Sequence, residues 1–243
     1  QWTVSVSGQP AGQTCTVIPP SGTAGVTNTI SVTCTTNTYS VGGISPPYGV
    51  TGLGAGMTVT LLNNGADGIT VANGSFTFPT KLPSGSLYNV TVSPQPVGWT
   101  CLVLNGSGVI SAANVTNVSV SCARNLYTVG GSVTGLASGN SVLLQLTGSL
   151  NGTNYGPACA TVSSNIGYTC ATQLPYQASY TVAVAAQPTG QYCAVTNGAG
   201  NVPAGNVTNA NVTCISPPAG PGAVNVGYGT KQINLSWAPV SGA

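Results

Sequence analysis

The sequence repeats one cysteine-bounded signature, Gln-Pro-x-Gly-x-x-Cys, at intervals of about 90 residues. The three copies, each with the cysteine that closes it, are 9–15 with Cys34, 95–101 with Cys122, and 187–193 with Cys214. A fixed period of this length indicates tandem domains, each large enough to own a hydrophobic core. Tandem domains of this size commonly serve as spacers, stalks or binding arrays, so the repeat constrains function as well as fold.

Aligning the copies divides the chain into four segments. They are the C-terminal half of a repeat over 1–34, a complete repeat over 39–122, a complete repeat with an extra disulfide over 127–214, and a linker with the start of another module over 216–243. In the half-repeat, Trp2 takes the place of Tyr88 and Tyr180. The linkers, 35–38 and 123–126, are too short for free swivelling, which predicts an elongated, stiff rod.

The apolar residues of each repeat alternate with polar ones. Val90 and Val92 follow Tyr88 at every second position, and Val120 and Cys122 continue the same pattern. Alternation over short runs that are separated by Gly, Asn and Pro predicts half-buried strands, about seven in each repeat and no helix. We therefore expect an all-β chain of tandem two-sheet β-sandwich domains.

The chain carries only four charged residues, namely Asp67, Lys81, Arg124 and Lys231, and it has no histidine or glutamate. Three scattered cations cannot neutralise the phosphates of a nucleic acid. One carboxyl group and two lysines are a poor inventory for general acid–base catalysis, so we expect no enzyme, no catalytic residue, no cofactor and no metal site. No apolar run is long enough to cross a membrane as a helix.

The low number of charged residues also affects whether copies of the chain associate with one another. A strand-rich chain with a formal net charge of +2 has little colloidal repulsion and should self-associate. The alternative is that abundant Ser, Thr and Asn, or glycans, keep it apart. The segment 1–34 lacks a counterpart of residues 39–87, so its apolar face is not covered by its own strands. Either a longer polypeptide or another subunit, as in donor-strand complementation, would then cover it.

Eight cysteines fall into four pairs of regular spacing. The C-x-x-C knuckles and histidines of zinc sites are missing, so the spacing predicts disulfides and an extracellular or cell-surface location. The predicted bonds are Cys15–Cys34, Cys101–Cys122, Cys159–Cys170 and Cys193–Cys214. Each 19–21-residue loop should contribute about 3 kcal/mol through the entropy of the unfolded chain.

The pair Cys159–Cys170 has a local geometric argument. Residues 160–163 and 166–169 read as two strands of a hairpin that turns at Ser164-Asn165, which would place the two cysteines opposite one another. The matching place in the previous repeat is Ile69–Val71 and Phe76–Phe78 around Asn73-Gly74, a strong hairpin signal.

Two parts of the sequence resemble known protein families. The repeats have Val-Gly-Gly at their start, Asn-Gly-Ser-Phe-Thr-Phe over 73–78 and Tyr-x-Val-x-Val before the signature, and they resemble repeats of large bacterial secreted and surface proteins, which occur next to Ig-like and fibronectin-like modules. The Gly-Ser-Phe-x-Phe and Tyr-x-Val runs also resemble the transthyretin-like, carboxypeptidase-regulatory sandwich. The resemblance therefore implies tandem Ig-like or transthyretin-like β-sandwich domains in an elongated rod. In the last copy, Tyr168-Thr169-Cys170 replaces Phe-Thr-Phe. Residues 223–243 resemble the opening of a fibronectin type III domain, with a first strand and then a strand that ends in Trp237. The resemblance implies an extracellular structural or adhesive role and supplies no active-site motif.

Several motifs admit a functional and a structural interpretation. Residues 63–68, with Asp67, could hold calcium but read better as a turn. The sequons could carry N-glycans or arise by chance; they begin at Asn73, Asn89, Asn105, Asn114, Asn117, Asn151, Asn206, Asn211 and Asn234. A carbohydrate-stacking face could be built from Trp2, Trp99, Trp237, Tyr48, Tyr155 and Tyr176, although we expect core positions for Trp2 and Trp237, and packing on a disulfide for Trp99 and Tyr192.

Taken together, the sequence favours a structural segment of an extracellular bacterial filament, stalk or surface fibre that self-associates head to tail. The alternative is an adhesin or carbohydrate-binding array on a cell-surface protein.

Overall fold

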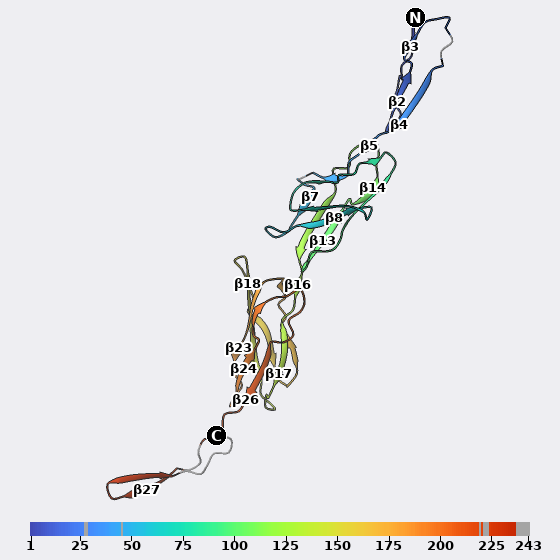
Figure 1. The fold of residues 1–243 in the computed structure, drawn as a ribbon. Helices are drawn as coiled ribbons and strands as arrows, with labels where there is room; N and C mark the ends of the chain where they lie inside the picture. Colours follow the sequence, from blue (N-terminus) through green and yellow to red (C-terminus); the bar gives the residue numbers. More distant parts are fainter. Residues whose placement is uncertain (27–28, 45, 219, 221–223, 237–243) are drawn as a thin grey trace. The chain divides into compact units, whose positions relative to one another are not determined.

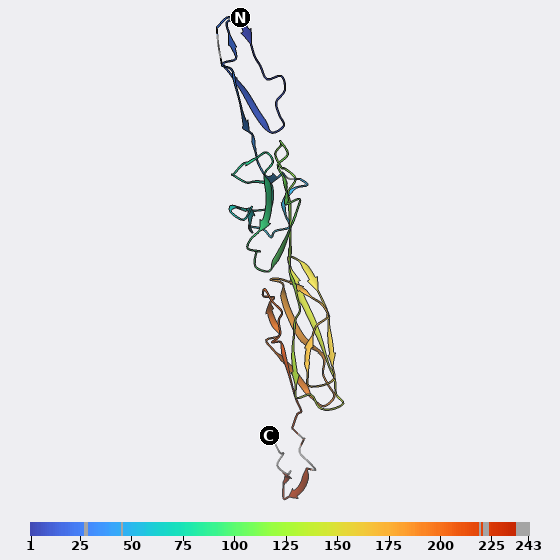
Figure 2. The same cartoon turned by 90° about the vertical axis from the view of Figure 1, so that its right-hand side faces the viewer.

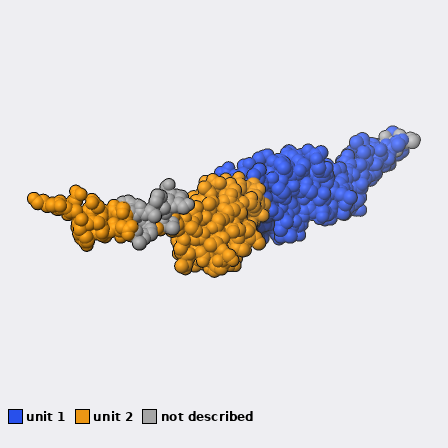
Figure 3. All heavy atoms as spheres, turned by 90° about the horizontal axis from the view of Figure 1, so that it is seen from below, with its two compact units in different colours: residues 1–124 blue, residues 125–243 orange. Residues whose placement is uncertain are grey.

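The computed structural model describes residues 1–26, 29–44, 46–218, 220 and 224–236, and these residues are all-β. The chain divides into two compact units, residues 1–124 and 125–243, coloured separately in Figure 3. Each unit is described by itself. Below, 1–36 is the N-terminal segment, 38–124 the middle repeat and 126–215 the last repeat.

The last repeat consists of two sheets that face each other (Figures 1 and 2). The first has the order β21-β17-β26-β24, made of Gly167–Thr169, Gly130–Thr134, Asn211–Ile215 and Tyr192–Thr196. The second has the order β19-β18-β23-β25, made of Thr153–Tyr155, Val142–Leu150, Ser179–Ala186 and Ala199–Asn201, with β20 (Ala158–Val162) also paired to β18. A short pair, β16 (Leu126–Tyr127) and β22 (Leu174–Pro175), lies beside them.

The core of this repeat lies between the two sheets. Leu144 and Leu146 of β18, Val182 of β23, Val133 of β17 and Val212 of β26 are all buried in one cluster. In β18 the residues between these buried ones are exposed. The period-two pattern of the sequence is therefore the inward face of a two-sheet sandwich.

The middle repeat has the same plan with shorter pieces. One sheet has the order β14-β12-β8-β9, made of Ser107–Val109, Leu87–Val92, Val59–Asn63 and Asp67–Val71. The other has the order β13-β15-β7, made of Trp99–Leu104, Ser119–Arg124 and Gly49–Thr51. The short pairs are β6 (Gly42–Gly43) with β10 (Phe76–Thr77), and β5 (Thr38–Tyr39) with β11 (Leu82–Pro83). In its described residues this repeat has eleven strands, β5–β15, which is more than the predicted seven.

An early strand of each complete repeat pairs in parallel with the strand that closes the repeat. β7 pairs with β15, and β17 pairs with β26 through Val133 opposite Val212. Isolated parallel bridges, such as Val129 with Val207, lie on the N-terminal side of these paired strands. Hydrogen bonds between this early strand and the last strand thus close each repeat.

The Val-Gly-Gly motif at the start of each repeat allows a close approach of backbones. A Cβ atom on Gly130 would lie 2.2 Å from the carbonyl oxygen of Tyr168, and one on Gly42 would lie 2.2 Å from that of Phe76. Any other residue would push these strands apart. The same registers show that Tyr168 occupies the place of Phe76, as the alignment of the sequences expects.

The N-terminal segment contains β1 (Trp2–Thr3), β2 (Gln13–Ile18), β3 (Ser21–Gly22) and β4 (Ser31–Thr36). Trp2 pairs with Gly22 as Tyr88 pairs with Gly108 and Tyr180 with Gly200. Its ring is only partly buried. β4 is exposed along its whole length, whereas its counterparts β15 and β26 alternate between buried and exposed residues.

The last strands, β27 (Asn225–Gly229) and β28 (Gln232–Ser236), form an antiparallel hairpin whose residues are exposed. They cover most of the two strands that the fibronectin-like resemblance predicts. Trp237 lies outside the described residues, so the position expected for its side chain stays a prediction.

The hairpin predicted for 160–163 and 166–169 is wrong. β20 pairs with β18 in one sheet, whereas β21 pairs with β17 in the other. The equivalent hairpin around Asn73-Gly74 is also wrong, because β9 pairs with β8 and β10 pairs with β6. The local turn signals are genuine, but in both repeats the chain uses the turn to cross from one sheet to the other. Within the described residues, no helix has the length and apolar character needed to traverse a bilayer.

Burial of Tyr168 predicts how stability depends on pH. Its hydroxyl donates a hydrogen bond of 2.5 Å to the carbonyl oxygen of Ala210. Burial, and secondarily the charge of Tyr180, raise the pKa of Tyr168 from 10.0 to about 12. A raised pKa means that the folded state favours the neutral phenol, so its contribution is complete below pH 10 and is lost as pH rises towards 12.

We therefore expect the free energy of unfolding to vary little from acid to neutral pH, since one side-chain carboxyl group and no histidine can titrate there, and to fall above pH 10. Urea unfolding across this pH range measures the effect. Tyr168→Phe should be less stable at neutral pH and should lose less stability between pH 10 and 12. An equal alkaline loss in both proteins would contradict the assignment.

Candidate functional site: a strand edge held by carboxamides and disulfides

The glutamine of each signature binds the backbone of the cysteine six residues later. In the last repeat, Gln187 Nε2 donates to the carbonyl oxygen of Cys193 at 3.0 Å, and the amide of Cys193 donates to Gln187 Oε1 at 2.7 Å. Gln95 and Gln9 make the same two bonds to Cys101 and Cys15 at 2.6–3.1 Å. One carboxamide thus makes the two backbone hydrogen bonds that a residue of a neighbouring strand would otherwise make.

The Pro-x-Gly part of the signature forms the turn that brings the glutamine back. The amide of Trp99 donates to the carbonyl oxygen of Pro96 at 3.0 Å, and Gly98 between them has φ of +72°. Positive φ at this third position is what a type II turn requires and what glycine adopts without strain. Gly12 and Gly190 have φ of +73° and +69° in the other copies.

The disulfide joins the same cysteine to the strand behind it. Cys101 lies directly opposite Cys122, and Cys193 opposite Cys214, with Cα atoms 4.0 and 3.9 Å apart. Such close pairs are the non-hydrogen-bonded positions of an antiparallel ladder, at which backbone groups point away from the partner strand. β13 and β24 are edge strands of their sheets, so the glutamine covers backbone groups that would otherwise be open to another chain.

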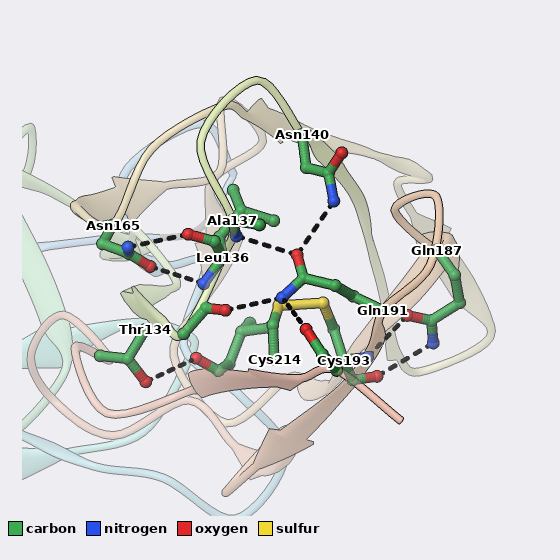
Figure 4. The surroundings of a disulfide bond; sticks show 12 residues. Thr134, Leu136, Ala137, Asn140, Asn165, Gln187, Gln191, Cys193 and Cys214 are labelled. Atoms are coloured by element: carbon green, nitrogen blue, oxygen red, sulfur yellow. Dashed lines mark hydrogen bonds between the residues drawn. A yellow bond between two sulfur atoms is a disulfide. The ribbon is translucent and has the colours of Figure 1, made fainter. Parts of the chain in front are cut away.

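Further carboxamides hold the loop between β17 and β18 in the last repeat (Figure 4). Asn165 accepts a bond from the amide of Leu136 at 2.8 Å and donates to its carbonyl oxygen at 3.0 Å. Gln191 accepts from the amide of Ala137 at 2.9 Å and from Asn140 at 3.0 Å, and it donates to the carbonyl oxygen of Gly135 at 2.8 Å. Uncharged side chains therefore fix this loop from two directions.

The middle repeat keeps one of these contacts and replaces the other. Asn73 bonds to both backbone groups of Leu53, at 3.0 and 2.9 Å, as Asn165 does to Leu136. Trp99 stands where the last repeat has Gln191, and its ring lies against the guanidinium of Arg124, 4.6 Å from the ring centroid. The indole N–H is buried and has no hydrogen-bond partner among the described residues. In the middle repeat, apolar and cation–π contacts therefore occupy the position at which the last repeat has the hydrogen bonds of Gln191.

The bond Cys159–Cys170 joins the two sheets. Cys159 belongs to β20 at the edge of one sheet, and Cys170 follows β21 at the edge of the other. Cys170 stands in the position of Phe78, which is buried and packs edge-to-face on Phe76 at 5.8 Å. The last repeat thus closes this side with a covalent bond where the middle repeat uses an aromatic pair. An 11-residue separation corresponds to about 3 kcal/mol on the chain-entropy model.

The structure forms the same four disulfides that the spacing predicts. The carboxamide contacts were not predicted, although the repeated glutamine at a fixed distance from cysteine is a visible signal for them in the sequence.

The polar motifs mostly take structural positions. In the turn 63–68, Asn63 accepts a bond from the amide of Asn89 at 3.2 Å, and Asp67 accepts one from the amide of Thr80 at 3.3 Å. No cluster of three His, Cys, Asp or Glu side chains that could hold a metal occurs in the described ranges. Sequon side chains that bond to the protein backbone include those of Asn73, Asn105, Asn114, Asn206 and Asn211.

Two of the aromatic candidates in the described residues pack against a core. Trp99 is 4% exposed, and Tyr155 packs partly on the core of the last repeat. The expectation that Tyr192 packs on the disulfide as a core residue is wrong, because its side chain is 60% exposed on the outer face of β24. The side chain of Cys193, one position on, points inward instead.

Comparison with known proteins finds no matching family model and no matching curated sequence. Among solved structures, the chain is similar to the Bacillus anthracis TIE protein, at 14% identity and a TM-score of 0.46 over 77% of this chain and 37% of that one. It is also similar to the pilus adhesin SpaC from Lactobacillus rhamnosus GG, at 13% identity and a TM-score of 0.32 over 84% of this chain and 31% of that one. The chain thus spans about a third of the length of these structures, and likeness at these values carries no argument about function.

The glutamine contact can be tested in the last repeat. Gln187→Ala removes two backbone hydrogen bonds and leaves polar groups of an edge strand unpaired, so we expect a loss of about 2 kcal/mol in the free energy of unfolding. Gln145→Ala is the matched control, because Gln145 is exposed in the same repeat and its side chain has no hydrogen bond within the described residues. Urea unfolding measures both; equal stability of the two variants would show that the contact contributes nothing.

Proposed function

We propose that this chain is a structural segment of an extracellular bacterial filament, stalk or surface fibre, built to bear tension along its length. The observation that carries the proposal is the parallel pairing of an early strand with the last strand of each complete repeat, β7 with β15 and β17 with β26. When the two ends of such a repeat are pulled apart, these hydrogen bonds are sheared together rather than opened one after another.

The connections between repeats support the same role. β4 ends at Thr36 and β5 begins at Thr38, while β15 ends at Arg124 and β16 begins at Leu126. Each intervening asparagine is tied to its own unit: the amide of Asn37 donates to the carbonyl oxygen of Gly12 at 2.8 Å, and that of Tyr176 donates to the carbonyl oxygen of Asn125 at 2.9 Å. Connections this short pass tension directly from strand to strand, which favours a stiff array.

Chemistry supports an extracellular site and a non-enzymatic role. Four disulfides persist in oxidising surroundings. The sequence has one acidic side chain and no histidine, which leaves little for acid–base catalysis, and three cations are too few for a nucleic-acid surface.

The N-terminal segment supports head-to-tail self-association. Ile30 and Val32 are 40% and 58% exposed, whereas Val118 and Val120 at the equivalent places are fully buried. Strands from a second copy could complete this sheet, and the exposed hairpin β27–β28 offers such strands. A contact between two different surfaces of identical chains propagates into a fibre.

Single-molecule force spectroscopy tests the tension-bearing role. We expect the two complete repeats to unfold at higher force than the hairpin β27–β28, whose bonds open singly. In the middle repeat, reduction of Cys101–Cys122, a separation of 21 residues, should lengthen the unfolded chain by about 70 Å. Repeats that yield at no higher force than the hairpin would rule out this role.

Sedimentation and negative-stain microscopy test association. The chain should form linear oligomers as its concentration rises, and the double variant Ile30→Asn/Val32→Asn should remain monomeric. Leu102→Asn is the control, since Leu102 is 66% exposed in the middle repeat and outside this face. A wild-type chain that stays monomeric at high concentration, or a control that fails to associate as well, would refute assembly through this segment.

Surface adhesion is the second candidate. The outer face of the larger sheet in the last repeat has a hollow of about 440 Å³ beside β18, lined by uncharged groups that include Thr147, Ser149, Asn154 and Thr181. Hydroxyl and carboxamide groups without charge suit a neutral sugar. Saturable binding of neutral oligosaccharides that is lost in Asn154→Ala would favour this candidate; no binding would leave the structural role alone.

A further inference from the structure

Five Asn-Gly pairs occur in the sequence, and they begin at Asn64, Asn73, Asn105, Asn151 and Asn197. An Asn-Gly pair can lose its side-chain amide without an enzyme, because glycine has no side chain to shield its backbone nitrogen. The reaction requires the carboxamide to leave its resting position and meet that nitrogen. The hydrogen bonds of each carboxamide therefore decide which pairs react in the folded chain.

In four of the pairs the side-chain amide is held by a backbone carbonyl oxygen. The bonds run from Asn64 to Leu87 at 3.1 Å, from Asn73 to Leu53 at 2.9 Å, from Asn105 to Asn117 at 3.1 Å, and from Asn197 to Asn209 at 3.4 Å. In the Asn73 pair, the attacking nitrogen is held too, because the amide of Gly74 donates to the carbonyl oxygen of Val50 at 2.9 Å. These four carboxamides are parts of the fold.

Asn151 differs from the other four. Its side chain is exposed and makes no hydrogen bond within the part of the chain that the structure describes. Asn151 and Gly152, with φ of +50° and +80°, form the turn between β18 and β19, where Leu150 pairs with Thr153. No heavy atom lies within 4 Å of where a Cβ of Gly152 would be, so no distant part of the described chain crowds this residue on that side.

We propose that Asn151 is a site of spontaneous deamidation in the folded protein. The backbone nitrogen of Gly152 forms a bond to Cγ of Asn151, and the side-chain nitrogen leaves as ammonia, taking up the proton that the Gly152 nitrogen loses. Water then adds to either carbonyl carbon of the five-membered ring and opens it to aspartate or isoaspartate. No oxidant or other co-reactant is consumed.

The new carboxylate changes the net charge of this chain by a larger fraction than it would in a protein with many charged residues. The sequence has one acidic residue and a formal net charge of +2, so one new carboxylate doubles the acidic residues and lowers the net charge to +1. The new charge lies at the tip of a hairpin that the middle repeat does not have, since there β8 turns directly into β9. Ageing of an extracellular array would thus mark its last repeat and not its middle one.

Peptide mapping by mass spectrometry tests the site. The full chain is incubated at mildly alkaline pH below its unfolding transition, and an identical sample is reduced and unfolded in denaturant. We expect the folded protein to convert Asn151 at least about tenfold faster than any other Asn-Gly pair, with the products captured by an isoaspartyl methyltransferase. In the unfolded sample all five pairs should react at similar rates.

Two variants separate this reaction from others. Asn151→Gln should abolish the acidic shift that isoelectric focusing detects, and Thr153→Ala, which removes the glycosylation sequon but keeps Asn-Gly, should leave it in place. Faster reaction at another pair of the folded chain, equal rates at all five pairs, or an unmodified Asn151 would overturn the proposal. None of these results bears on whether the repeats carry tension.

Discussion

The pair of hydrogen bonds between a glutamine carboxamide and the backbone of an edge cysteine is the contact on which each repeat is built. It occurs three times with the same atoms, at Gln9, Gln95 and Gln187. The cysteine it holds is bonded through its side chain to the closing strand of the repeat, so one residue joins turn, edge and neighbouring strand. An open sheet edge invites pairing with other chains, and the carboxamide occupies that edge at its centre.

This contact also shows how the chain manages without charges. Ordinary domains protect edges and fix loops with lysines, glutamates and ion pairs. Here Asn165 and Gln191 fix a loop through five hydrogen bonds to Leu136, Ala137, Asn140 and Gly135. Carboxamides carry no charge, so these hydrogen bonds do not depend on an ionised side chain.

The two complete repeats show that one backbone plan accepts different solutions at equivalent positions. Phe78 and Cys170 occupy the same place, and so do Trp99 and Gln191. In each case one repeat uses apolar contact and the other a covalent or hydrogen bond. The backbone plan therefore depends on strand pairing and on the glutamine–cysteine contact. At the remaining positions, any side chains that fill the space and give buried polar groups a hydrogen-bond partner are accepted.

The sequence by itself determined the period, the strand content and all four disulfide pairs, because cysteine spacing and alternation are local or repeated signals. It also revealed that Trp2 is the counterpart of Tyr88. The predictions of hairpins around Asn73 and Ser164 were wrong. A turn signal indicates that the chain bends, but it does not indicate which strand the next segment pairs with. Only the tertiary structure decided that Cys159–Cys170 joins two sheets, that β7 and β17 run parallel to the last strands of their repeats, and which asparagines are held. Each of these depends on residues far apart in sequence that meet only after the sheets have packed.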